Sequence, residues 1–73
     1  MTYTYQRLRD LREDHDQKQE AIAQVLGISR QQYQLYESGK RELPMHHFTV
    51  LARYYNVSLD YLAGLVDTPK KLY

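Results

Sequence analysis

Hydrophobic residues recur every three or four positions in five short segments of this chain. Phe48, Leu51 and Tyr55 follow the helical spacing in one segment, and Leu59 and Leu62 do so in the next. Such spacing places apolar side chains on one face of a helix, where they are expected to point toward the core. The predicted helices cover residues 4–14, 18–26, 30–38, 44–55 and 59–63. The pattern therefore predicts an all-α fold.

Residues that cap or stop helices mark the boundaries of these segments. Small polar side chains accept hydrogen bonds from the free N–H groups at a helix start, and glycine or asparagine adopts the left-handed conformation that ends a helix. The predicted N-caps are Thr4, Asp16, Ser29 and Ser58. The predicted helix ends are Gly27, Gly39, Asn56 and Gly64. Pro44 suits the first turn of the fourth helix. Residues 1–5 also alternate as in a strand, so the start of the first helix stays open.

Residues 19–39 are the most informative part of the sequence, because they predict two short helices joined by a tight turn. Ala23 stands where the helices would cross, and Gly27 stands where the turn needs a positive φ. At 100° per residue, one side of the helix over residues 30–38 carries Tyr33, Tyr36 and Glu37. The opposite side carries Arg30, Gln31, Gln34 and Leu35. If the tyrosines belong to the core, the exposed face presents Arg and Gln, which are suited to reading base edges in a DNA major groove.

Composition and charge restrict the class of protein. With 73 residues the chain makes one domain, expected over residues 1–66 with a short tail over residues 67–73. The sequence has no cysteine for a disulfide or a thiolate zinc site, and no apolar run as long as a membrane span or signal peptide, which predicts a soluble, cytoplasmic protein. The net charge is only +1, from 10 basic and 9 acidic residues, so any DNA affinity must depend on where the charges lie.

Several short motifs together resemble one known family. Each motif is weak alone, but their order and spacing are specific. They are Leu8-x-x-Leu11-Arg12, Gln19-Glu-x-Ile-Ala23, Leu26-Gly-Ile-Ser29, Tyr36-Glu-x-Gly-Lys-Arg41, Pro44, Leu51-Ala52 and Val57-Ser-Leu-Asp-x-Leu62. With them the chain resembles the helix-turn-helix domains of the lambda-repressor/Cro-like (XRE) group, over about residues 5–65.

The resemblance implies a compact five-helix domain, with its helix-turn-helix at the second and third helices, that binds double-stranded DNA. It implies a transcriptional regulator, a repressor in our interpretation, that acts as a homodimer without a cofactor. Gln19 would hold a phosphate and brace the residue beside it, Arg30 and Gln31 would contact bases, and Lys40 and Arg41 would grip the DNA backbone. The expected DNA-binding residues are Gln19, Arg30, Gln31, Gln34, Leu35, Lys40 and Arg41.

Two of these residues have open alternatives, and several positions depart from the family pattern, among them Asp16, Gln17, Lys18, Leu35 and Met45. Leu35 would meet a thymine methyl group or would simply be an exposed leucine, and Gln34 would reach a phosphate or nothing. Family members often have a polar or basic residue at the position of Leu35, and a glycine at the position of Asp16.

Other classes of function fit the sequence less well. The same fold also serves as a protein-interaction module, for example an antitoxin or a coactivator-like adaptor, and a protein partner stays open for this chain. Enzyme activity is not expected, because no glycine-rich phosphate loop and no nucleophile with a matching His and carboxylate is present. A metal site is not expected either, since adjacent His46 and His47 would point about 100° apart on a helix.

Overall fold

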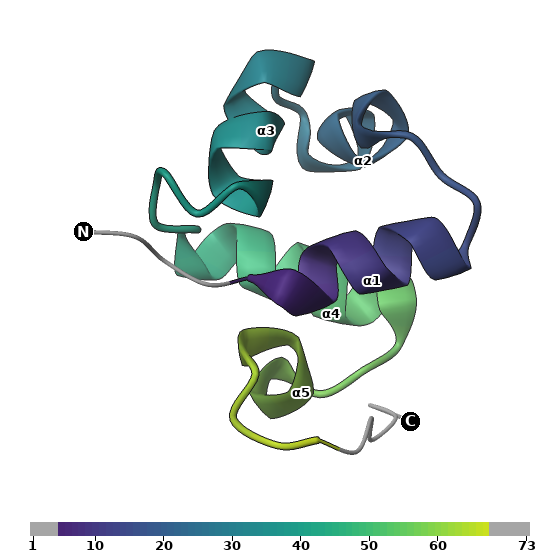
Figure 1. Ribbon diagram of the computed structural model, residues 1–73, viewed down its shortest axis with the longest axis vertical. Helices are drawn as coiled ribbons and strands as arrows, with labels where there is room; N and C mark the ends of the chain where they lie inside the picture. The colour runs from purple at the N-terminus through teal and green to yellow at the C-terminus, as the bar shows by residue number, and fades with distance from the viewer. Residues whose placement is uncertain (1–4, 68–73) are drawn as a thin grey trace.

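The computed structural model describes residues 5–67, and these residues form five α-helices and no strand (Figure 1). The helices are α1 (Gln6–Asp14), α2 (Gln19–Leu26), α3 (Arg30–Glu37), α4 (Met45–Tyr55) and α5 (Leu59–Ala63). In Figure 1, α2 and α3 lie at one end and α5 at the other, with α1 and α4 between them. None of the helices in this range is long and apolar enough to cross a membrane. The predicted all-α fold, with a helix-turn-helix at α2 and α3, is confirmed.

All five helices contribute to the core. Each supplies one large side chain that is almost completely buried, and these are Leu8, Ile22, Tyr33, Leu51 and Leu62. Tyr36 and Tyr55 are also buried around this centre. The prediction that the tyrosines of the third helix belong to the core is therefore confirmed, and the opposite face of α3 is left outside.

The apolar face of α5 is narrower than its sequence pattern predicts. Leu62 is buried, but Leu59 is 37% exposed, so the expectation that Leu59 faces the core is wrong. The helix has only five residues, little more than one turn, and one turn directs few side chains into the core. Leu59 instead lines a shallow apolar groove of about 240 Å³, which it shares with Met45, Phe48 and Leu65.

Most of the predicted caps are in place. The hydroxyls of Ser29 and Ser58 each accept a hydrogen bond from a backbone N–H in the first turn of their helix, over 3.1 Å. Gly27, Asn56 and Gly64 all have the left-handed conformation that ends a helix. The helix bounds therefore agree with the sequence pattern to within a residue or two.

Asp16 does not cap α2, which corrects the prediction for this residue. It belongs instead to the end of α1, with a φ of 53°. The N–H of Gln17 donates to the Arg12 carbonyl and the N–H of Asp16 donates to the Glu13 carbonyl, both over 3.0 Å. This pair of bonds is a Schellman motif, in which Asp16 occupies the left-handed C′ position that favours glycine. Lys18 is the residue before α2, and its side chain makes no capping bond. The other predicted N-cap, Thr4, lies outside the described residues.

Candidate nucleic-acid interface

The turn between α2 and α3 has a fixed backbone conformation. Gly27 ends α2 with a φ of 71°, and the N–H of Ile28 donates to the carbonyl of Ala23 over 3.0 Å. Ser29 follows directly and caps α3 through its hydroxyl. Ala23 itself is buried, and α2 packs against α3. The outer face of α3 is therefore held in one orientation relative to α2.

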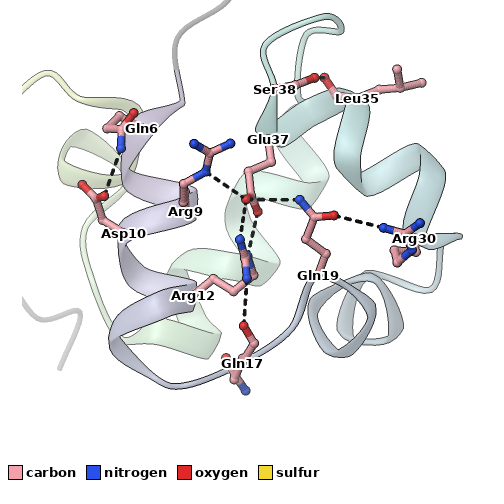
Figure 2. A network of polar contacts seen from close by, with 10 residues as sticks. All are labelled: Gln6, Arg9, Asp10, Arg12, Gln17, Gln19, Arg30, Leu35, Glu37 and Ser38. Carbon is pink, nitrogen blue, oxygen red and sulfur yellow. Dashed lines mark hydrogen bonds and ion pairs between the residues drawn. The ribbon is translucent and has the colours of Figure 1, made fainter.

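The outer face of α3 carries the polar residues that the helical projection assigns to it. Arg30, Gln31 and Gln34 are exposed, while Leu35 is half-buried. Figure 2 shows the Leu35 side chain pointing away from the polar contacts around Glu37. Four of the seven predicted DNA-binding residues thus come from one helix, and three of these are open to a ligand.

The loop after α3 brings two further cations to the end of that helix. The backbone carbonyl of Leu35 accepts hydrogen bonds from the N–H groups of Lys40 over 2.9 Å and Arg41 over 3.1 Å. Gly39, with a φ of 80°, allows the chain to turn back in this way. Both cationic side chains are exposed, and no ion pair within residues 5–67 engages them or Arg30. Their charges remain available to an anionic partner.

Gln19, at the start of α2, connects the outer face to the interior of the domain (Figure 2). Its amide Nε2 donates to Oε1 of Glu37 over 3.3 Å, and its Oε1 accepts from Nη1 of Arg30 over 3.5 Å. The predicted contact between Gln19 and the residue beside it, Arg30, is thus present.

Glu37 is the centre of this group of contacts, and its side chain is only 1% exposed. The guanidinium of Arg12 binds it in two places, with Nη2 2.8 Å from Oε1 and Nε 3.0 Å from Oε2. Nε of Arg9 lies 3.5 Å from Oε1. Arg12 also donates to the backbone carbonyl of Gln17 over 2.9 Å. One arginine of α1 therefore joins α3 to the turn that precedes α2.

The ion pair keeps Glu37 charged although it is buried. Burial alone raises the pKa of this carboxyl, but hydrogen bonds from Arg12 and Gln19 and the charge of Arg12 outweigh it. The net pKa of Glu37 therefore lies below its ordinary value. Burial raises the pKa of Tyr33, and the nearby charge of Glu37 raises it further. At neutral pH we thus expect an ionised Glu37 beside a neutral Tyr33.

Arg9, Arg12 and Glu37 belong to the site but were not among the residues predicted from sequence. A signal for Glu37 was present, because a carboxylate on the same face as Tyr33 and Tyr36 needs a partner when it is buried. Nothing in the local pattern identifies that partner, since Arg12 comes from a helix 25 positions earlier in the chain.

The arrangement is suited to binding an extended anionic ligand. Three exposed cations lie on and beside α3, together with amide groups that donate and accept hydrogen bonds. In the part of the chain that the structure describes, no three His, Cys, Asp or Glu side chains come together as metal ligands. The rings of His46 and His47, which were not expected to share a metal ion, lie with their centroids 4.2 Å apart.

Comparison with known proteins identifies the family. Residues 8–62 match the helix-turn-helix family. The chain is 42% identical over 64 residues to an uncharacterised HTH-type transcriptional regulator, YobD, of Bacillus subtilis, covering 88% of this chain and 57% of that protein. It is 31% identical over 62 residues to the cryptic phage CTXphi transcriptional repressor RstR of Vibrio cholerae, covering 85% of this chain and 56% of that protein.

The chain thus spans little more than half the length of these relatives. No solved structure matches it. The family match covers the turn between α2 and α3. All five of the almost completely buried side chains, one from each helix, also lie within it, so the fold and the comparison agree. The chain belongs to the helix-turn-helix family, as a member of its lambda-repressor/Cro-like group.

Proposed function

We propose that this chain is a sequence-specific DNA-binding transcriptional regulator that inserts α3 into the major groove. The observation that carries the proposal is the outer face of α3, where Arg30, Gln31 and Gln34 are exposed on a helix whose orientation the Gly27 turn fixes. Family membership and the printed names of both relatives support DNA-binding transcriptional regulation. We infer repression in particular, in line with the name of the Vibrio cholerae relative.

In this proposal α3 reads bases while flanking residues hold phosphates. Arg30 donates two bonds to guanine O6 and N7, and Gln31 pairs with adenine N6 and N7, each worth about 1–3 kcal/mol of base discrimination. Lys40 and Arg41 bind phosphates and so set the register without reading sequence. Gln19 has a second amide hydrogen left for a phosphate after its bond to Glu37.

Two residues of α3 have smaller roles. Gln34 lies at the edge of the exposed face and reaches a phosphate, and Leu35 contributes an apolar contact to a thymine methyl group. The half-burial of Leu35 limits the area that it offers to DNA.

We further propose that the chain acts as a homodimer on a two-fold symmetric site, with half-sites roughly 34–36 Å apart. The apolar groove between α4 and α5 supports this, because Met45 and Leu65 are 66% and 76% exposed beside it. The proposal places the protein in the cytoplasm and assigns it neither a cofactor nor an enzymatic activity. The alternative of a protein-interaction module has no support from the family match or the relatives' names.

The test is selection of binding sites from a random duplex library by the purified protein. We expect enrichment of a two-fold symmetric motif whose half-sites lie on one face of the duplex. An enriched motif without two-fold symmetry would contradict the homodimer but would still support a sequence-specific regulator. Recovery of no motif at modest salt would contradict sequence-specific binding and favour a protein partner.

A further inference from the structure

Glu37 is buried whereas the proposed base-reading residues of α3 are exposed, yet a chain of contacts joins it to one of them (Figure 2). Its Oε1 accepts from Nε2 of Gln19 over 3.3 Å, and Oε1 of Gln19 accepts from Nη1 of Arg30 over 3.5 Å. Because its side chain is only 1% exposed, Glu37 has no access to DNA itself. Of its contacts, the one with Gln19 leads on to Arg30.

The charge of Glu37 determines which way the Gln19 amide points. A carboxylate only accepts hydrogen bonds, so the NH₂ group of Gln19 must face it and the amide oxygen must face outward. The reversed amide would place oxygen against the carboxylate and NH₂ against the Arg30 guanidinium, and neither pair can form a hydrogen bond. Arg12 and Arg9 bind the same carboxylate, and Arg12 keeps it ionised. The amide orientation thus depends on a buried ion pair.

We propose that Glu37 is a positioning residue for base reading, which fixes the Gln19 amide and thereby the guanidinium of Arg30. This inference rests on the proposed function, because it concerns how α3 discriminates between bases. Arg30 uses one of its five N–H groups on Gln19 and keeps the others for a base edge. A guanidinium held before binding loses less side-chain freedom when it meets its base.

A purely structural Glu37 would behave differently. Loss of the Arg12–Glu37 pair would lower the fraction of folded protein and weaken binding to every duplex by the same factor. It would leave unchanged the ratio of affinities for two duplexes that differ at one base pair. That ratio is therefore the readout that separates positioning from stability.

The experiment compares Glu37→Gln, Gln19→Met and the double variant with the wild type. Gln19→Met has a similar length, makes no amide bond and leaves the Arg12–Glu37 pair intact, so it remains informative if Glu37→Gln is poorly folded. Dissociation constants are measured on the selected duplex and on single-base substitutions of it. Arg30→Ala and Gln31→Ala assign the base pair that each residue reads.

We expect both single variants to lose about three- to tenfold in discrimination at the Arg30 base pair, the cost of ordering one long side chain. Discrimination at the Gln31 base pair should stay the same, and the double variant should lose no more than either single variant. Unchanged ratios at the Arg30 base pair, or losses that add in the double variant, would overturn the inference.

A second measurement on the DNA-free protein separates this inference from the proposed function. NMR follows the side-chain amide of Gln19 and the carboxyl carbon of Glu37 as the pH is lowered, with the exposed amide of Gln34 as the control. The ionisable groups facing Glu37 are Arg9 and Arg12 from α1, Tyr33 from α3 and Tyr55 from α4. We expect the Gln19 amide to follow the Glu37 titration and Gln34 not to. If Gln19 is insensitive, the inference fails even where DNA is bound selectively; if no duplex is bound selectively, the proposed function fails, whatever the NMR result.

Discussion

The inner and outer faces of α3 belong to one helix of eight residues, but their side chains have different surroundings. On the inner face, Tyr33, Tyr36 and Glu37 are buried and bound to other helices. On the outer face, Arg30 and Gln31 are exposed and make few contacts within the chain. One short helix thus meets two requirements. Its inner residues pack against the rest of the domain, and its outer residues are available to bind a ligand. Substitutions on the inner face should change stability, with Glu37 also acting on base reading through Gln19, whereas those on the outer face should change DNA binding.

The largest effect is expected at Tyr33, the most buried aromatic residue of α3. Tyr33→Ala removes a ring from the centre of the core and should lower the free energy of unfolding by about 3–5 kcal/mol. Tyr33→Phe keeps the ring and serves as the control, with a loss below about 1.5 kcal/mol. Denaturant unfolding followed by circular dichroism measures both. Equal losses in the two variants would mean that the hydroxyl, and not the packing, holds the inner face.

The next effect concerns the two arginines that meet Glu37. Arg12→Ala leaves a buried carboxylate without its main partner and should cost about 3 kcal/mol of unfolding free energy. Arg9→Ala is the matched control, because Arg9 is 50% exposed and 3.5 Å from the carboxylate, against 14% and 2.8 Å for Arg12. Its loss should stay below about 1 kcal/mol. If both variants lose the same unfolding free energy, burial does not determine the strength of the two arginine–Glu37 ion pairs.

Acid should weaken the inner face through Glu37. Its folded-state pKa is lowered, so the stability that its charge contributes is complete above the ordinary glutamate pKa of about 4.3 and is lost as the pH falls through the lower, folded value. Unfolding of the wild type and of Glu37→Gln is compared between neutral and acidic pH. The difference in stability should shrink in acid, by about 1.4 kcal/mol for each unit by which the pKa is lowered. A constant difference would show that the charge of Glu37 contributes nothing.

The smallest effect is expected beside the outer face, at Lys40. Lys40→Ala should weaken binding to all duplexes about equally and reduce the salt dependence of binding by about one unit. Lys40→Arg keeps the charge and should retain the salt dependence. Binding curves at several salt concentrations measure both variants. A change of preference at a single base pair would mean that Lys40 reads sequence.

Much of the fold was predictable because its signals are local. The spacing of apolar residues and the caps at Ser29 and Ser58 placed the helices to within a residue or two. Gly27 and Asn56 marked helix ends correctly because a left-handed residue is required there. The helical period also placed Tyr33 and Tyr36 on the side of α3 away from Gln31 and Leu35.

The errors arise from local backbone geometry, and the omission arises from a contact between two helices. Asp16 has the side chain of an N-cap, but the backbone bonds that close α1 place it in a left-handed turn. Leu59 has the spacing of a core residue, yet the short α5 directs only Leu62 fully inward. The partner of Glu37 could not be predicted, because Arg12 approaches it from a different helix.

The most direct test of the central claim, that the outer face of α3 reads DNA, is the motif selected from a random duplex library by Gln31→Ala. We expect this variant to be as stable as the wild type and to lose its preference at one base pair in each half-site, by about 1–3 kcal/mol. Gln24→Ala, an equally exposed glutamine on α2, is the control and should retain the wild-type motif. An unchanged motif for Gln31→Ala, or the same change for Gln24→Ala, would contradict base reading by α3.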